Sequence, residues 1–488
     1  MAHWSPQELQ EILVAHCEGP PNAVGVGERA YPRFGPALFT PDYAILCSLN
    51  TGDLAEMKDK ARVVCLQERF LENSPPRDTQ SILSHPVPEM LPAGGRLLLY
   101  RQTDAIQRMA DARRWHVLAN PPQLRLPWDN KAVFRRRLME MGLAALQFES
   151  VELESLSPER CSALMRRWGS PLVIQIPCFP RGGGRSSFLL QEPGEVKLLR
   201  CAWKQGTHMG HSFKEVMISP WVPGPSLSME GCVTPRGVLV SPLQLQLVDI
   251  EEVLPPGGMG RFCGHQWGGE WRWERWAEPM ARSITVKVGQ AMAREGYRGI
   301  FGLDFVLDME RETLWVLECN PRYTGAFPTL TLLQWERGLV PLEFFHVLSF
   351  MRTDPGQIPT WAVELTSYPV GPAAQLLLFH RDPWEAQVGR TLPSGRYLWN
   401  PQESKAERLG PALPFPQLPV SNNEFLILDG PPPLGHRIRP ARELERLLRL
   451  VFFKRITGED PRHLLPEVAQ VVRWIYRSLG LERCWDGL

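Results

Sequence analysis

The stretch that most constrains this chain runs from residue 299 to residue 322. It contains two runs rich in aromatic and branched side chains, at residues 300–307 and 313–319. A short polar connection, Asp-Met-Glu-Arg-Glu, separates the two runs. Two apolar runs joined this closely predict a β-hairpin.

Polar side chains recur at fixed places in this hairpin. Glu318 and Asn320 are two residues apart, so a strand places both on one face. Asp304 lies directly opposite Glu318 if the connection holds an odd number of residues centred on Arg311. Two carboxylates and an amide oxygen then form an oxygen-only site, the kind that suits Mg2+. Taken alone, the pattern also fits a plain hairpin with a solvated acidic face.

Length and composition narrow the class of protein. A chain of 488 residues predicts two to four domains. The 54 basic and 53 acidic side chains nearly balance, which argues against binding of nucleic acid or a membrane surface through bulk charge. We see no secretion signal, no apolar run of membrane-spanning length and no Cys-x-x-Cys pair among the ten cysteines. A cytoplasmic protein with reduced thiols is expected.

The N-terminal part alternates strand-like and helical segments. Residues 43–47, 62–66 and 96–100 are short apolar runs, and residues 103–114 have a helical pattern. Such alternation predicts a parallel sheet covered by helices, which is an open α/β domain. The segment Asn-Thr-Gly-Asp at residues 50–53 is either a turn, which turn chemistry favours, or a ligand loop at a strand end.

Residues 127–142 predict a helix with Asp129 as its N-cap and Gly142 as its end. Apolar side chains recur on one face of it, at Phe134, Leu138 and Met141. Lys131 lies in the first turn. It is either a solvated surface lysine or a phosphate ligand.

A glycine-rich turn follows the apolar run 171–177. Its glycines are Gly182, Gly183 and Gly184. Glycine lets backbone N–H groups approach phosphate oxygens closely, and Arg185 and Ser186 add side-chain donors. A lone glycine run also fits a flexible hairpin.

The hairpin resembles the metal-binding hairpin of the ATP-grasp superfamily, whose pattern is Gly-x-Asp/Glu-Phe, then a hairpin, then Glu-x-Asn-Pro-Arg. The resemblance implies that Asp304, Glu318 and Asn320 hold one or two Mg2+ ions, which Mn2+ can replace. It implies that Arg322 neutralises a phosphoryl group or a carboxylate, with the planar fork of its guanidinium. It gives Lys131 and the glycine-rich turn the task of holding the phosphates of ATP. The order of these motifs along the chain matches the superfamily.

The resemblance extends to a hinge, where the backbone of Pro220 and Val222 would read adenine. Pro220 keeps its carbonyl and Val222 its N–H, so this contact survives the prolines. Two positions depart from the family pattern. Gln175 stands where a phosphate-binding lysine is usual, and Ser219 where a ribose-binding glutamate is frequent. We still expect Gln175 at the nucleotide, as an uncharged hydrogen-bonding side chain.

Two further segments carry weaker signals. A Gly- and Trp-rich stretch around His265 predicts a loop before a helix; His265 is either a general base in the acceptor pocket or a structural residue. Beyond residue 351 we expect strands at 374–380 and 424–428 and a helical stretch from 439 to 479. The helical pattern rests on the spacing of Leu444, Leu447, Leu448 and Val451.

The resemblance implies a fold of mixed α/β and α+β class. We expect an N-terminal open α/β domain at residues 1–125, an ATP-grasp core of two lobes at 126–350 and an appended C-terminal α/β segment at 351–488.

The implied activity is that of an ATP-dependent carboxylate–amine ligase. The carboxylate becomes an acylphosphate, and an amine then displaces the phosphate. Arg322, Arg185 and His265 are the expected catalytic groups, and ATP, a small carboxylate and an amine are the expected partners. Two alternatives stay open: a carboxylase of the same superfamily, or a nucleotide-binding scaffold or sensor without turnover. The sequence does not identify the acid, the amine or the oligomeric state, and a homo-oligomer stays open.

Overall fold

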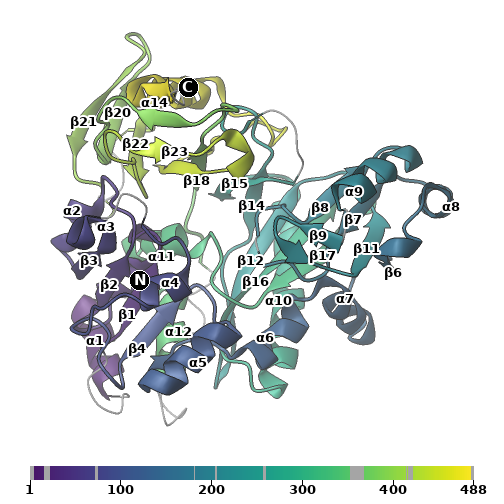
Figure 1. Cartoon of the computed structure of the whole chain (residues 1–488), viewed down its shortest axis with the longest axis horizontal. Helices are drawn as coiled ribbons and strands as arrows, with labels where there is room; N and C mark the ends of the chain where they lie inside the picture. Colours follow the sequence, from purple (N-terminus) through teal and green to yellow (C-terminus); the bar gives the residue numbers. More distant parts are fainter. Residues whose placement is uncertain are drawn as a thin grey trace.

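The computed structural model has three parts, which Figure 1 shows as an N-terminal body, a long central sheet and a small lobe that projects to one side. It describes residues 5–15, 22–71, 75–180, 182–203, 206–255, 260–351, 368–413, 415 and 421–484. Within these ranges, no helix is both long and apolar enough for a membrane crossing.

The N-terminal body is a five-stranded parallel sheet in the order β3-β2-β1-β4-β5. Its strands are β1 Val24–Gly27, β2 Ala44–Cys47, β3 Arg62–Cys65, β4 Arg96–Leu99 and β5 His116–Val117. Its helices are α1 Pro6–Ala15, α2 Leu54–Lys58, α3 Leu66–Phe70, α4 Thr79–Leu83 and α5 Asp104–Arg113. The short apolar runs form strands because both faces of the sheet are buried. The predicted open α/β domain is confirmed.

The small lobe is a four-stranded antiparallel sheet in the order β6-β11-β7-β8. Its strands are β6 Glu149–Glu152, β7 Leu172–Gln175, β8 Ser187–Leu190 and β11 Glu215–Pro220. Two helices, α8 Pro158–Trp168 and α9 Val196–Ala202, pack with it around a core of its own. A short hairpin, β9 Thr207–His208 and β10 His211–Ser212, completes the lobe.

The long sheet has eleven strands, ten of them in the order β17-β16-β12-β14-β15-β18-β24-β22-β20-β21, with β13 paired to β12. Strands from the first half are β12 Ser226–Thr234, β13 Gly237–Val240, β14 Gln244–Val248, β15 Phe262–Trp267, β16 Gly299–Asp308 and β17 Thr313–Asn320. Strands from the C-terminal part are β18 Ala373–Phe379, β20 Gly395–Asn400, β21 Lys405–Gly410, β22 Glu424–Leu428 and β24 Arg446–Phe452. The sheet thus continues from β15 into β18, across the expected boundary at residues 350–351. The domain limits themselves stay a prediction.

Helices and a small sheet surround the long sheet. The helices are α6 Pro122–Asp129, α7 Lys131–Glu140, α10 Glu274–Arg294, α11 Phe327–Glu336, α12 Leu342–Met351 and α14 Pro466–Leu479. The small sheet is β19 Ala386–Val388, β23 Arg437–Ile438 and β25 Leu481–Arg483.

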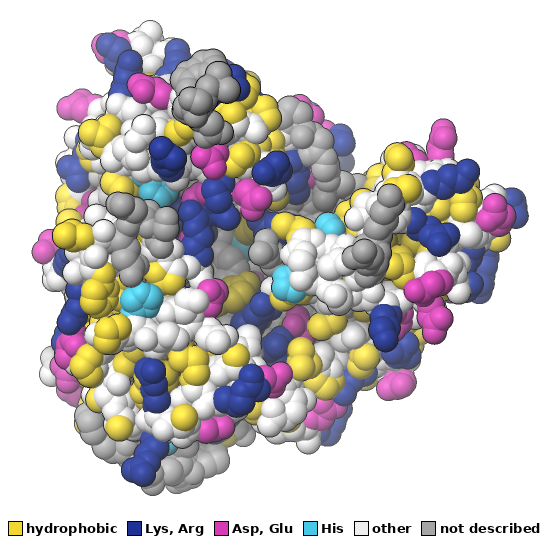
Figure 2. All heavy atoms as spheres, viewed as in Figure 1, with side chains coloured by type: hydrophobic (Ala, Val, Ile, Leu, Met, Phe, Trp, Pro, Cys, Tyr) yellow, Lys and Arg dark blue, Asp and Glu magenta, His cyan; other side chains and the backbone are white. Residues whose placement is uncertain are grey.

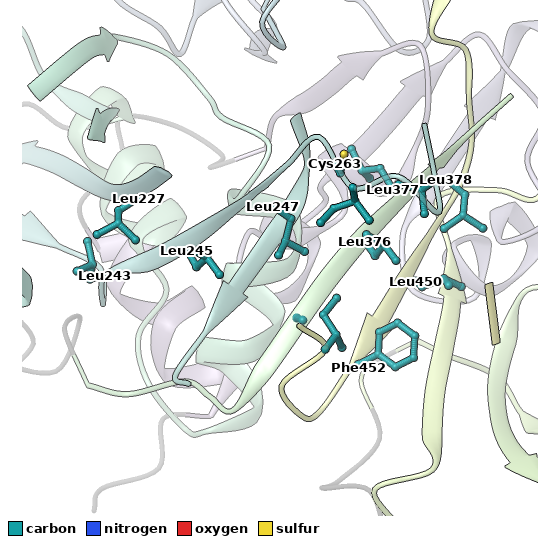
Figure 3. Packing of buried hydrophobic residues seen from close by; sticks show 14 of the residues in the cluster. Leu227, Leu243, Leu245, Leu247, Cys263, Leu376, Leu377, Leu378, Leu450 and Phe452 are labelled. Atoms are coloured by element: carbon teal, nitrogen blue, oxygen red, sulfur yellow. The ribbon is translucent and has the colours of Figure 1, made fainter. Parts of the chain in front are cut away.

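The two faces of the long sheet differ because side chains alternate along each strand. Figure 3 shows the apolar face, where leucines of β12, β14, β18 and β24 pack with Cys263 and Phe452. Most residues between them point to the other face, although Leu377, between Leu376 and Leu378, also belongs to this core. On β14, for example, Leu245 and Leu247 are core residues, and Gln244 and Gln246 belong to the polar face.

The C-terminal helical prediction is wrong for most of its length. Residues 446–452 form the central strand β24, and the helix α14 covers only Pro466–Leu479. Six of the seven residues of β24 are buried, so its apolar run is nearly continuous and satisfies a helical spacing as well as a strand. Pairing with β18 and β22 stabilises the strand rather than a helix at these residues. The strands expected at 374–380 and 424–428 are present.

Candidate functional site

The hairpin β16–β17 places Asp304 directly opposite Glu318. The connection holds four residues, 309–312, and not the odd number expected. That length alone would pair Asp304 with Leu317. A β-bulge beside Asp304 leaves Leu317 without an opposite residue and restores the pairing of the two carboxylates. The juxtaposition was predicted, but it arises from a bulge rather than from the turn.

Side chains from three other positions meet these carboxylates. Asn320 Nδ2 donates to Asp304 Oδ2 at 2.8 Å, and Gln246 Nε2 donates to Asp304 Oδ1 at 2.7 Å. Lys131 Nζ forms an ion pair with Glu318 Oε2 at 2.5 Å. The structure therefore brings the three predicted metal ligands together.

The chemistry of this donor set fits Mg2+. Asp304, Glu318 and Asn320 offer only oxygen ligands, and Mg2+ usually takes one or two carboxylates and completes its shell with water and phosphate oxygens. No group of three or more His, Cys, Asp or Glu side chains that could hold a metal occurs in the described part of the chain. The set thus offers two carboxylates and one amide oxygen, fewer ligands than a complete protein cage would supply.

The two carboxyl groups have opposite pKa shifts. Burial and the facing Glu318 carboxylate raise the pKa of Asp304. Burial acts to raise the pKa of Glu318 as well, but the charges of Lys131 and Arg322 and the hydrogen bonds with Lys131 and Asp304 together outweigh burial and lower that pKa. Two carboxyl groups that face each other resist ionising together without a cation, which is why their pKa values diverge.

Lys131 reaches Glu318 from the first turn of α7. The N-cap is Asn130, whose Oδ1 accepts from Ala132 N and Val133 N at 3.1 Å each. The predicted cap, Asp129, instead ends the preceding helix α6. Two helices abut at this point, so the cap position moves by one residue. Among the two interpretations of Lys131, the contact with Glu318 excludes a merely solvated side chain.

Arg322 lies at the end of the hairpin and contacts both the long sheet and the N-terminal body. Its Nη2 donates to Asn320 Oδ1 at 2.6 Å, and its Nη1 donates to the hydroxyl of Tyr100, just past β4, at 2.7 Å. A Cβ placed on Gly182 would lie 3.7 Å from Arg322 Nη2. The glycine-rich turn of the small lobe therefore lies over Arg322.

The glycine-rich turn joins β7 to β8, as predicted. Gly183 and Gly184 have φ of +77° and +78°, and a Cβ on Gly184 would lie 1.8 Å from the carbonyl oxygen of Gly260. Glycine is required at residue 184 for this close approach of two backbones. Arg185 Nη1 donates to Gly182 O at 3.0 Å, while Ser186 is buried beside the turn, with 6% of its surface exposed.

Gln175 ends strand β7 next to this turn. Its Nε2 donates to Ser187 Oγ at 2.8 Å, and its Oε1 accepts from Arg135 Nη2 at 3.4 Å. The predicted hinge residues lie where the two lobes join: Pro220 ends β11, and Val222 lies in the segment 221–225 that leads to β12. All predicted nucleotide-binding residues thus border the junction between the small lobe and the long sheet.

His265 lies on strand β15 and not in a loop as expected. It is 3% exposed, and its Nδ1 is 2.7 Å from Gln375 Nε2. Burial and the nearby Arg449 charge lower the pKa of His265 to about 3. An imidazole with so low a pKa is a weak base, and its burial keeps it from substrate, which together favour the structural alternative for this residue.

A row of polar side chains crosses the polar face of the long sheet, and of its members only His265 was a predicted site residue. It consists of Ser228, Glu230, Gln244, Gln246, His265, Gln375 and Arg449. Hydrogen bonds join several neighbours in the row, such as Gln244 to Ser228 and Glu230. The signal in the sequence was polar alternation at 226–230 and 244–246, which becomes informative only when the strand order is known.

Figure 2 shows a hollow between the small lobe and the rest of the molecule, with Lys and Arg side chains along its walls. Lys131, Arg185 and Arg322, together with the buried Arg135, supply positive charge at this lobe junction. A basic hollow above two carboxylates suits a polyanion that arrives with divalent cations.

Comparisons with known proteins identify the fold. No family model matches the chain, and no curated protein matches its sequence. Biotin carboxylase from Campylobacter jejuni superposes with a TM-score of 0.57 at 12% identity, over 89% of this chain and 88% of that chain. The biotin carboxylase domain of 2-oxoglutarate carboxylase from Hydrogenobacter thermophilus gives 0.56 at 11% identity, over 88% and 86%. Phosphoribosylamine–glycine ligase from Thermotoga maritima gives 0.51 at 14% identity, over 95% and 98%.

These similarities extend over most of each chain, so they include the N-terminal body and the C-terminal strands as well as the hairpin. At 11–14% identity they show the fold alone. The chain has the ATP-grasp fold, as the hairpin motif predicted.

Proposed function

We propose that this protein is an ATP-dependent ligase that activates a carboxylate as an acylphosphate and joins it to an amine. The observation that carries the proposal is the meeting of Asp304, Glu318, Asn320, Lys131 and Arg322 beneath the glycine-rich turn. These are the groups that phosphoryl transfer requires, since it depends on positioning and charge neutralisation more than on covalent help from the protein.

Each residue has a defined role in this proposal. Asp304, Glu318 and Asn320 hold one or two Mg2+ ions, or Mn2+, which neutralise charge on the phosphates. Lys131 and the backbone of residues 182–184 hold the nucleotide phosphates, with Arg185 and Ser186 at the turn and Gln175 beside it. Pro220 and Val222 offer backbone groups to the base. Arg322 binds the transferring phosphoryl group or the carboxylate, and His265 has a structural role.

The reaction proceeds in two steps. A carboxylate oxygen attacks the γ-phosphorus, the bond from that phosphorus to the bridging oxygen breaks, and ADP leaves with the electron pair. The amine nitrogen then attacks the acyl carbon, the bond from carbon to the phosphate oxygen breaks, and inorganic phosphate leaves. The proton of the amine passes to phosphate or solvent.

The structural neighbours support the first step most directly. The Hydrogenobacter protein was crystallised with MgADP and bicarbonate, and the Thermotoga protein is named as a ligase of an amine and glycine. With bicarbonate as the acid, the same first step would give a carboxylase. No contact among the described residues favours that alternative over an organic acid.

The test is a calorimetric titration with Mg-AMP-PNP of the wild type, of Glu318→Ala and of Glu310→Ala. Glu310 is an exposed carboxylate in the turn of the same hairpin and serves as the matched control. We expect metal-dependent binding by the wild type and the control, and its loss in Glu318→Ala, because the nucleotide and the metal share that ligand. Equal affinity of the two variants would refute the metal assignment.

Turnover is tested separately by phosphate release from ATP across a set of acids combined with amines. We expect release that depends on both an acid and an amine. Binding without any release would favour the scaffold or sensor, and release with bicarbonate alone would favour the carboxylase.

A further inference from the structure

Arg135 is a buried cation at the junction of the two lobes. It lies on α7, one turn after Lys131, and only 1% of its surface is exposed. The first residue of α7 is tied to the small lobe, since Lys131 N donates to Pro177 O at 3.0 Å. The same helix contacts β17, which carries Glu318. Arg135 therefore lies between strand β7 and the paired carboxylates.

The charge of Arg135 is incompletely paired. Its Nη2 donates to the neutral Gln175 at 3.4 Å, while its Nε and Nη1 are buried without a hydrogen-bond partner among the described residues. The ring of Phe148 lies 6.0 Å from the guanidinium carbon. Burial lowers the pKa of Arg135 to about 10, so the group stays protonated at neutral pH. The negative charge of Glu318 acts to raise this pKa, but Glu318 already forms an ion pair with Lys131.

A buried charge without a full complement of partners is costly. Arg135 gives Gln175 a defined orientation. Gln175 Oε1 accepts from Arg135, and its Nε2 donates one of its two N–H groups to Ser187 Oγ at 2.8 Å. The second N–H of the amide is left for another acceptor, and the cation behind the amide oxygen strengthens this donor.

We propose that Arg135 supplies the positive charge that strand β7 lacks and acts through Gln175 to bind a phosphate of the nucleotide. The proposal rests on the proposed function, and it makes Arg135 a positioning residue. A neutral side chain at position 175 then serves as a phosphate ligand because a buried guanidinium polarises and orients it. The proposal assigns a role to a residue for which the motifs of the sequence predict none.

The test compares binding of Mg-AMP-PNP with binding of adenosine, which lacks phosphates. We expect Arg135→Met to weaken Mg-AMP-PNP about 10- to 100-fold, the range of a charge-assisted hydrogen bond, and to leave adenosine within about twofold. Arg136→Met, the exposed neighbour on the same helix, is the matched control and should bind both ligands like the wild type.

Rescue separates this role from a structural one. In Arg135→Met, the second change Gln175→Lys should restore most of the affinity for Mg-AMP-PNP, because the charge returns at the end of β7. In the wild-type background, Gln175→Lys should not improve binding, since two cations would then be adjacent. A double-mutant cycle reports this change of sign as coupling between the two positions.

Three outcomes would overturn the inference: unchanged affinity for Mg-AMP-PNP in Arg135→Met, equal loss for Mg-AMP-PNP and adenosine, or no rescue by Gln175→Lys. If Arg135→Met does not fold, Gln175→Met keeps the inference testable, because it breaks the relay with Arg135 in place and should show the same phosphate-specific loss. A wild type that binds no Mg-AMP-PNP would refute the proposed function together with this inference. A wild type that binds while all variants bind equally would refute the inference alone.

Discussion

Two clusters of charged and polar side chains lie on the polar side of the long sheet, and their hydrogen-bond and ion-pair partners differ in kind. The hairpin cluster consists of Asp304, Glu318, Asn320, Lys131 and Arg322. The junction cluster, where the N-terminal body meets the C-terminal strands, consists of Arg29, Asp53, Asp429, Arg446 and Arg449.

In the junction cluster the partners include main-chain groups of the opposite part of the molecule. Arg29 Nη1 donates to Asp429 O at 2.6 Å, and Asp53 Oδ2 accepts from Asp429 N at 2.6 Å. Arg446 and Arg449 form ion pairs with the Asp429 side chain at 3.0 and 3.2 Å. Main-chain partners cannot rotate away, so these contacts fix the two parts to each other.

In the hairpin cluster the contacts to the two carboxylates come from side chains. Asp304 is held by the amides of Gln246 and Asn320, and Glu318 by Lys131. These partners can turn toward a ligand by changing rotamers. The cluster also sets two carboxylates opposite each other, which costs stability unless a cation joins them. The junction cluster is thus held by main-chain partners and is more deeply buried, whereas the carboxylates of the hairpin cluster, which we propose as functional, have side-chain partners and are partly exposed.

The largest effect expected from this comparison is on stability. Arg449→Met leaves Asp429, which is fully buried, without one of its cations, and we expect the free energy of unfolding to fall by about 3–5 kcal/mol. Lys131→Met breaks an ion pair whose side chains are 14% and 28% exposed, and should cost clearly less, about 1 kcal/mol. Urea denaturation followed by tryptophan fluorescence measures both. Equal losses would remove the distinction between the clusters.

Local patterns made the hairpin cluster predictable. The hairpin, Lys131 and the glycine-rich turn were each predicted from residues close together in the sequence. The order of these motifs along the chain then indicated that they form one site. The bulge at Leu317 was not predictable, because the pairing of two strands and not the turn length decides it. Neither was Arg135, since nothing in a helical pattern says which arginine is buried.

The junction cluster could not be predicted from the sequence. Arg29 and Asp429 are 400 residues apart, and no motif links them. Their contact depends on β24, and the spacing of apolar residues at 444–451 had predicted a helix there instead of a strand. The loop at residues 50–53 belongs to this junction: Gly52 N donates to Pro431 O at 2.9 Å, so the turn interpretation is favoured over a ligand loop.

The second effect is a pH dependence that originates in the junction cluster. Burial and the Asp429 charge raise the pKa of Asp53 from its ordinary value of 3.8 to about 7. The folded state therefore holds a proton that the unfolded state releases, and stability is lost as pH rises from about 4 to about 7, by up to about 1.4 kcal/mol per pH unit.

Asp53→Asn keeps an oxygen for the N–H of Asp429 and removes the titration. We expect the decline of stability between pH 5 and pH 7 to be shallower in this variant than in the wild type, as measured by urea denaturation at several pH values. Parallel profiles would mean that Asp53 is ionised in the folded protein and that its arginine neighbours dominate.

The smallest effect concerns Glu230, which lies in the polar row beside the hairpin cluster. Burial raises the pKa of this carboxyl group to about 8, against the hydrogen bonds from Thr324 and Gln244 that lower it. The group is therefore mostly neutral at pH 7, and a neutral amide of the same shape should replace it.

We expect Glu230→Gln to bind Mg-AMP-PNP within about twofold of the wild type at pH 7, because a hydrogen bond between neutral groups is exchanged for a similar one. Between about pH 4.5 and pH 8 the wild type should lose stability that the variant keeps, because the folded carboxyl group holds a proton that the unfolded state releases. A loss of affinity of tenfold or more at pH 7 would show instead that Glu230 acts as an ionised member of the hairpin cluster.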